Sequence, residues 1–145
     1  MLNNLFIDTD VILDILLDRK EFFDDSAAIF QKFEDGEVLL STSTSIIINA
    51  QYIGQKKIGK PECRFAINYL LKYFLIMEAT IDVIKKAYAS KFSDIEDAIQ
   101  YYTATQNENI DYFITRNTKD FRTGESGMQV VTPSRFLKIY KQNSN

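Results

Sequence analysis

The sequence Leu-Phe-Ile-Asp-Thr-Asp-Val-Ile-Leu-Asp at residues 5–14 has the pattern of a short buried strand that turns directly into a helix. Phe6 and Ile7 favour a strand, and Asp8 follows at the position where that strand would end. A carboxylate buried at a strand end is unfavourable unless a positive group or a metal ion lies against it. In open parallel α/β sheets, ligands bind at the carboxyl ends of the strands. Asp8 is therefore the first candidate for a site residue.

The 145 residues, 46% of them hydrophobic and 26% charged, are enough for one globular domain with a core of its own. We expect a single domain over residues 1–145. The N-terminal stretch lacks the basic and apolar regions of a signal peptide, and no apolar run is long enough to span a bilayer. We therefore expect a cytoplasmic protein that does not act at a membrane.

The side chains that carry most enzyme chemistry are missing from this sequence. It contains no histidine and a single cysteine, Cys63, which excludes a Ser–His nucleophile, most zinc sites and an internal disulfide. Chemistry is left to carboxylates, whose oxygen atoms suit Mg²⁺ or Mn²⁺. The net charge of −3 means that any nucleic-acid binding must depend on local basic patches.

The rest of the chain alternates between strand and helix patterns. The expected helices cover about residues 11–17, 27–33, 43–54, 61–71, 81–90, 93–106 and 133–140, with later strands at 38–41, 74–77, 112–115 and 130–131. Gly54 is expected to end the third of these helices, and Pro61 to begin the fourth. The alternation predicts a parallel sheet covered by helices on both faces.

A second group of acids lies in Ser-Asp-Ile-Glu-Asp-Ala at residues 93–98. Ser93 and Glu96 have the spacing of a capping box, which would start a helix with Asp94 and Asp97 on one face. Acids in a first turn can simply favour the helix dipole. If this helix packs beside the first strand, however, Asp8, Asp94 and Asp97 converge and repel one another until a divalent cation neutralises them.

Three polar residues after the fourth strand are a further candidate: Thr115, Asn117 and Asp120. They follow a strand end, where ligands of a parallel sheet collect. The structural alternative is a turn closed by the Asn117 side chain.

The stretches at residues 6–14, 93–101 and 114–121, in this order, resemble the PIN-domain family, particularly its VapC-type toxin ribonucleases. The resemblance covers nearly the whole chain. It implies a three-layer α/β/α sandwich whose sheet of about five parallel strands has the order 3-2-1-4-5. It also implies a Mg²⁺- or Mn²⁺-dependent endoribonuclease, in which one or two ions activate water and stabilise the leaving oxygen.

The resemblance also implies roles for individual residues. Asp8, Asp94 and Asp97 correspond to the catalytic acids, and together with Asn117 to the metal ligands. The accessory positions are Asp10, Thr115, Asp120 and Asn49. Asn49 departs from the family, which usually has a glutamate there, so the pocket carries fewer charges than a standard site. Asp14, one turn further along the first helix, is expected at the surface or behind the site.

The partners follow from the same resemblance, whereas the candidate RNA contacts follow from the distribution of basic residues. A toxin-type member would form a homodimer, and a small antitoxin would cover the acidic pocket with its tail. The predicted RNA contacts are Lys56, Lys57, Lys60, Arg64, Arg116 and Lys119, and the alternative for each is an ordinary solvated cation.

Two other functions fit parts of the sequence. With Asn49 and Asn117 in acidic positions, the domain could be a scaffold that binds RNA or a protein partner without cutting. The spacing of Asp8 and Asp10 also resembles the first motif of haloacid-dehalogenase-type phosphatases, where the first aspartate is a nucleophile and the second an acid/base. That scheme gives no role to Asp94 and Asp97.

Overall fold

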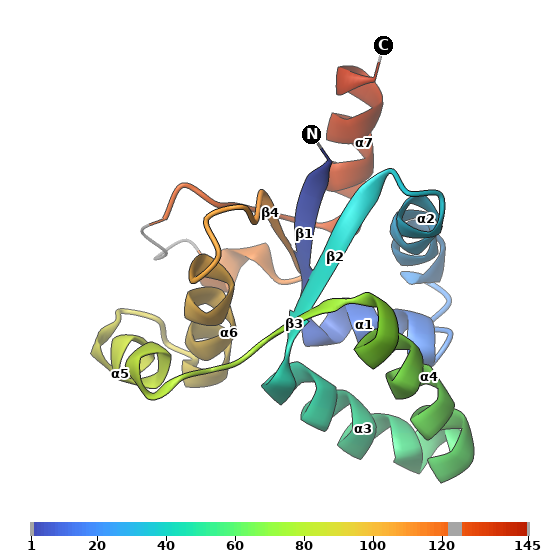
Figure 1. The fold of residues 1–145 in the computed structure, drawn as a ribbon, viewed down its shortest axis with the longest axis horizontal. Helices are drawn as coiled ribbons and strands as arrows, with labels where there is room; N and C mark the ends of the chain where they lie inside the picture. The colour runs from blue at the N-terminus through green and yellow to red at the C-terminus, as the bar shows by residue number, and fades with distance from the viewer. Residues whose placement is uncertain (1, 122–125, 145) are drawn as a thin grey trace.

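The computed structural model describes residues 2–121 and 126–144 and contains a five-stranded sheet in the order β3-β2-β1-β4-β5, in which all paired strands are parallel. The strands are β1 (Asn3–Ile7), β2 (Val38–Ser43), β3 (Leu75–Met77), β4 (Tyr112–Ile114) and β5 (Gln129–Val131). This order confirms the sheet expected from the sequence. It puts β1 and β4 side by side although they are far apart in the chain (Figure 1).

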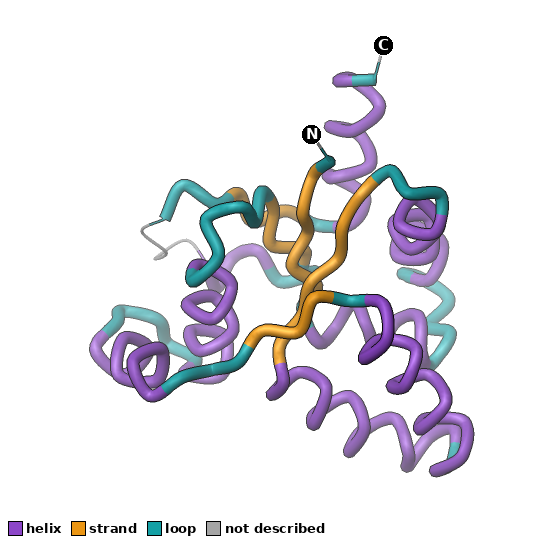
Figure 2. Tube along the Cα trace, in the orientation of Figure 1, coloured by secondary structure: helices purple, strands orange, loops and turns teal. Residues whose placement is uncertain are grey.

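Helices cover the sheet on both sides. In Figure 2 the orange strands lie in the middle, with purple helices on either side of them. The helices are α1 (Thr9–Leu16), α2 (Phe23–Glu34), α3 (Thr44–Ile58), α4 (Lys60–Tyr73), α5 (Ile81–Ala89), α6 (Ile95–Thr105) and α7 (Pro133–Asn143), with a 3₁₀ turn η1 (Thr118–Phe121). Helices α5 and α6 pack together on one side, and α2 and α4 lie on the other (Figure 1). The fold is the predicted α/β/α sandwich. Within the described residues, no helix combines the length and apolar character needed to cross a membrane.

Strand β1 is central because its side chains are apolar on both faces. Leu5, Phe6 and Ile7 are all completely buried, as expected for a strand covered by helices on both sides. Phe6 stacks on Phe113 of β4, with ring centroids 5.1 Å apart. The chain therefore leaves the middle of the sheet at Asp8, at the edge where the parallel strands end.

The predicted end of α3 at Gly54 is wrong, because the helix continues to Ile58. A Cβ at position 54 would lie 2.7 Å from Leu16 Cδ2 and 2.9 Å from Cys63 Sγ. Gly54 therefore allows α1 and α4 to approach α3 closely. The chain leaves the helix instead at Gly59, whose φ of 88° is in the left-handed region that favours glycine.

The predicted capping box at the start of α6 is also wrong. The helix begins at Ile95, and its N-cap is Asp94 rather than Ser93: an Asp94 carboxylate oxygen accepts a hydrogen bond from the Asp97 N–H at 3.0 Å. An aspartate satisfies the free N–H groups of a first turn as well as a serine does. The shift by one residue leaves Glu96 outside the cap, and its carboxylate accepts a hydrogen bond from the Asn49 amide on α3 at 2.9 Å.

Candidate active site

Asp8 is held at the junction between β1 and α1 by two hydrogen bonds. It is the N-cap of α1: Oδ1 accepts a hydrogen bond from the Thr9 N–H at 2.8 Å. Oδ2 accepts one from the hydroxyl of Thr115, at 2.9 Å, directly after β4. The Asp8 N–H in turn donates to the carbonyl of Ile114 at 3.0 Å. The pairing of β1 with β4 thus brings the first and third sequence motifs into contact.

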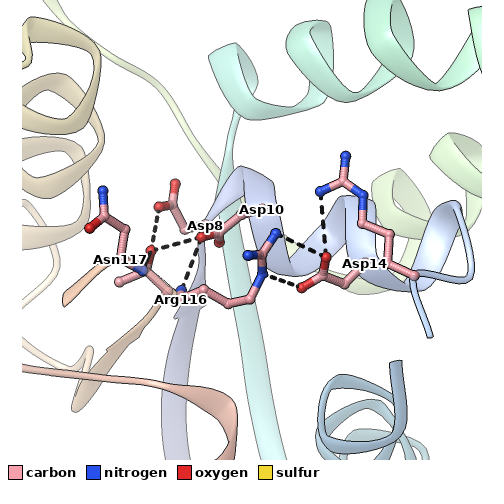
Figure 3. A network of polar contacts seen from close by, with 7 residues as sticks. Asp8, Asp10, Asp14, Arg116 and Asn117 are labelled. Carbon is pink, nitrogen blue, oxygen red and sulfur yellow. Dashed lines mark hydrogen bonds and ion pairs between the residues drawn. The ribbon is translucent and has the colours of Figure 1, made fainter. Parts of the chain in front are cut away.

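Asp10 joins the same group from the first turn of α1 (Figure 3). Its Oδ2 accepts a hydrogen bond from the Arg116 N–H at 3.0 Å and lies 3.3 Å from the Thr115 hydroxyl. Its Oδ1 is buried and has no hydrogen-bond partner among the described residues. A buried carboxylate oxygen without a partner is costly, so Asp10 has an unused ligating atom in this pocket.

Asp97, in the first turn of α6, is near enough for its charge to raise the pKa of Asp8, and the charge of Asp10 raises the pKa of Asp97. Helix α6 is attached to the end of β2 by Gln100, which is buried. Its amide oxygen accepts a hydrogen bond from Ser43 and its amide nitrogen donates to Ser45, both at 2.6 Å. These contacts place the first turn of α6 beside the ends of the central strands. Asp8, Asp10 and Asp97 are called the carboxylate cluster below.

The electrostatics of the carboxylate cluster favour its neutral form when no cation is bound. Burial, with the neighbouring Asp10 carboxylate as the next cause, raises the pKa of Asp8 to about 7. Burial also raises the pKa of Asp97 to about 6, and the charges of Asp94 and Asp120 add to this shift. The pKa of Asp10 is raised by burial as well. Such shifts are expected where several acids share a desolvated site.

The donor set of the cluster suits a hard divalent cation. Oxygen atoms of carboxylates are the ligands that Mg²⁺ and Mn²⁺ prefer, and a bound cation would offset both the burial and the mutual repulsion. In the part of the chain that the structure describes, no three acidic, cysteine or histidine side chains already stand at metal-ligating spacing. The fit therefore rests on the chemistry of the donors and on the partnerless oxygen of Asp10.

The other predicted site residues lie around the cluster in different ways. Asn117 follows Thr115 and donates its backbone N–H to the Thr115 hydroxyl at 3.3 Å, while its side-chain amide donates to the Asp120 carboxylate. Asn49 is turned toward Glu96 on α6. Asp94 uses one carboxylate oxygen as the cap of α6.

The predicted RNA-contacting cations fall into two groups. Lys56, Lys57, Lys60 and Arg64 are exposed around the α3–α4 turn. Helix α3 is about 22 Å long at 1.5 Å per residue, so this turn is one helix length from the Ser43 end of α3. Lys119 is exposed on η1, four residues after Thr115. The role of these cations in binding RNA stays a prediction.

Arg116, a predicted RNA contact, is partly buried, and its guanidinium is paired with a carboxylate. Its Nε donates to Asp14 Oδ2 at 2.7 Å and its Nη2 to Asp14 Oδ1 at 3.2 Å (Figure 3). The guanidinium carbon lies 3.9 Å from the centroid of the Phe22 ring. Asp14 is fully buried, so of its two expected places, at the surface or behind the site, the structure agrees with the second.

Sequence reasoning missed the pairing of Asp14 with Arg116 and the anchoring of α6 by Gln100. One signal was present: Asp14 follows Asp10 by four residues and so lies on the same side of α1. Its partner could not be inferred, because no local pattern links residues about one hundred positions apart.

A family model described as PIN domain matches residues 4–119. Comparison with curated proteins gives no match. Among solved structures, a toxin–antitoxin complex from Klebsiella pneumoniae is similar with a TM-score of 0.64 and 24% identity, covering 89% of this chain and 97% of that one.

Two further solved structures share the fold at 11% identity. VapC20 of Mycobacterium tuberculosis, described as a sarcin-ricin loop cleaving toxin, has a TM-score of 0.65 and covers 84% of this chain and 96% of its own. VapBC2 of Rickettsia felis, solved with a DNA fragment from its promoter, has a TM-score of 0.65 with coverages of 88% and 96%. At these identities the likeness shows the fold alone.

Proposed function

The chain belongs to the PIN domain family, and from that premise we propose that it is a Mg²⁺- or Mn²⁺-dependent endoribonuclease whose active site is the carboxylate cluster. The observation that carries the proposal is the link between Asp8 and Asp10 through the Thr115 hydroxyl, with Asp97 near enough for its charge to raise the pKa of Asp8. The pKa of Asp8 rises to about 7, and Asp10 keeps a carboxylate oxygen without a partner among the described residues. Acids arranged in this way are poised for a cation.

Asp8, Asp10 and Asp97 would hold the metal ion, with Asp94, Asn117 and Asp120 at the margin of the pocket. When bound, a divalent ion lowers the pKa of its water and stabilises charge on the oxygens of a phosphodiester. The chain's own contribution is to orient the ligands. Thr115 and the Thr9 N–H fix the carboxylate of Asp8, and the Arg116 N–H fixes that of Asp10.

The similarity to toxin–antitoxin structures supports a more specific form of the proposal. One similar structure is a toxin–antitoxin complex and another is described as cleaving the sarcin-ricin loop. On this basis we propose an RNA as the substrate and a small antitoxin protein as a partner; a second copy of the chain is proposed from the family resemblance alone.

The test is cleavage of a structured RNA by purified protein in Mn²⁺ or Mg²⁺. Cleavage is expected to disappear in EDTA and in Asp8→Asn or Asp97→Asn, because each substitution removes a charged ligand. Asp35→Asn is the matched control, since Asp35 is an exposed residue at the C-cap of α2, where β2 begins and not where it ends. Equal cleavage by the wild type and both site variants would refute the proposal.

A non-cutting scaffold is the second candidate, favoured by the neutral side chains of Asn49 and Asn117 in positions where acids were expected. It predicts RNA or partner binding without metal-dependent cleavage. Hydrolysis of p-nitrophenyl phosphate that depends on Asp10 would instead favour a phosphatase.

A further inference from the structure

We infer that Asp14 and Arg116 are positioning residues: their ion pair attaches the segment after β4 to helix α1 and thereby fixes Asp10 in the carboxylate cluster. The inference rests on the proposed function for its consequence, which is metal binding. The contact itself is independent of that function.

The side chain and the backbone of Arg116 contact different residues of α1. The guanidinium forms a two-pronged contact with Asp14 at 2.7 and 3.2 Å, which sets its direction as well as its distance. The backbone N–H of the same residue donates to Asp10 Oδ2 at 3.0 Å. Asp10 and Asp14 are one helical turn apart, so a single residue contacts α1 at two successive levels (Figure 3).

The segment between the sheet and η1 depends on this attachment. The Thr115 N–H donates to Val131 of β5, which is the last sheet hydrogen bond on this strand, and Phe121 is buried in the core at the far end. Between these anchors, the Arg116 N–H has the Asp10 carboxylate as its hydrogen-bond acceptor. The Asp14–Arg116 pair holds the backbone where this bond can form.

Burial makes the attachment strong. Asp14 has no exposed surface, and the Arg116 side chain is 28% exposed and stacked against Phe22. A buried carboxylate that loses its partner is strongly destabilising, so the paired arrangement is favoured. Because its guanidinium contacts Asp14, Arg116 acts on the cluster through its backbone.

The test compares three variants in the full chain. Asp14→Leu combined with Arg116→Met replaces the ion pair by apolar side chains and leaves no unpaired buried charge, so that the protein still folds. Arg116→Lys keeps the charge but loses the two-pronged geometry. Arg19→Gln is the matched control, because Arg19 also contacts Asp14, at 3.5 Å, but has no contact with the segment after β4.

Two measurements are made on each variant. Hydrogen exchange by NMR at the Arg116 amide reads the position of the segment directly, and titration with Mn²⁺ reads its consequence. We expect exchange about 10-fold faster or more in the double variant. Mn²⁺ affinity should fall about 10- to 100-fold, the usual effect of removing a group that orients metal ligands. The exchange rate and the Mn²⁺ affinity of Arg116→Lys should lie between those of the double variant and the wild type. Both values for Arg19→Gln should match those of the wild type.

The possible outcomes distinguish the positioning role of the ion pair, a role of Arg116 in RNA binding and the proposed nuclease activity. Unchanged exchange in the double variant, or faster exchange with unchanged Mn²⁺ affinity, overturns the inference. A loss in Arg19→Gln equal to that in the double variant also overturns it. An increase in KM for RNA in Arg116→Lys, with Mn²⁺ affinity unchanged, would assign Arg116 to RNA binding instead. A wild type that binds Mn²⁺ but cuts no RNA refutes the proposed nuclease and leaves the inference standing. If the wild type binds no Mn²⁺, exchange at Arg116 alone decides whether the pair positions the segment.

Discussion

The hydroxyl of Thr115 carries one hydrogen and lies between two carboxylate oxygens, 2.9 Å from Asp8 and 3.3 Å from Asp10. It can donate to only one of them at a time. If both acids are ionised, one of them loses this hydrogen bond while two charges face each other. The metal-free pocket therefore favours keeping a proton on the pair, in agreement with the raised pKa of Asp8.

This proton makes the stability of the metal-free protein depend on pH. The pKa of Asp8 is about 7 in the folded state against 3.8 in an ordinary carboxyl, so between pH 4 and 7 the folded state binds a proton that the unfolded state has released. Stability is therefore highest in acid and falls as the pH rises through this window. At about 1.36 kcal/mol per unit of pKa, the loss amounts to at most about 4 kcal/mol.

We expect Asp8→Asn to remove most of this dependence and to make the metal-free protein more stable at pH 8 than the wild type. Asp97 should leave a smaller residual slope, because its pKa is also raised. The measurement is urea unfolding in EDTA at several pH values between 5 and 8, with Asp35→Asn as the control. An Asp8→Asn variant with the same slope as the wild type would show that Asp8 is not the group responsible.

Helix α3 illustrates how packing decides the extent of an element. Gly54 lies in the middle of it, where the space that a Cβ would need is taken by Leu16 and Cys63. The neighbouring helices contact α3 over its buried face, which includes Ile46 and Ala50. The glycine thus lowers helix propensity but allows the close packing of α1, α3 and α4.

Gly54→Ala is therefore expected to destabilise the protein by about 1–3 kcal/mol, although alanine favours helices over glycine. The control is Asn68→Ala on an exposed position of α4, which should be neutral or slightly stabilising. Chemical unfolding of both variants measures the difference. A stabilised Gly54→Ala variant would mean that the neighbours move aside at little cost.

The elements show which features of the sequence predict structure. The N-caps Thr80 and Thr132 and the alternation of strands and helices could be predicted, because caps and strand patterns depend on nearby residues. The order of the strands depends on distant pairings, and it was expected only from the family resemblance. The role of Gly54 could not, because it is decided by side chains from other helices. At the start of α6, Ser93 and Asp94 both satisfy the local rule, and only the structure distinguishes them.

The site residues can also be divided into those that nearby residues predict and those that depend on distant contacts. Asp8, Asp97 and Thr115 were predicted from strand ends and a helix start, and the fold puts Thr115 in contact with Asp8 and brings Asp97 near enough to raise the pKa of Asp8. The closer involvement of Asp10 and the burial of Asp14 depend on Arg116, which arrives from a distant part of the chain. Contacts of this kind have no local signal.

For the whole molecule, a bound cation should act as a stabiliser. Several neighbouring acids with raised pKa values destabilise the metal-free fold at neutral pH. An ion that binds only the folded state offsets this destabilisation. At a Mn²⁺ concentration 100 times its Kd the gain is about 2.7 kcal/mol, which for a chain of this size raises Tm by about 5–10 °C.

We expect this rise in Tm at pH 7.5 in Mn²⁺ and its absence in Asp8→Asn, measured by thermal unfolding. Sodium chloride at equal ionic strength is the control for general screening of the negative charge. An equal rise in sodium chloride, or in the Asp8→Asn variant, would contradict specific binding at the cluster.

The pairing of β1 with β4 has a consequence for the newly made chain. Thr115 is 107 residues beyond Asp8, and Asp97 belongs to the helix just before β4. Asp8 and Asp10 therefore cannot contact these residues until most of the chain has been synthesised. Strands β1, β2 and β3 pair with one another, so these pairings do not require β4. During synthesis the contacts of Asp8 with the residues after β4 would thus form only in the last stage of folding.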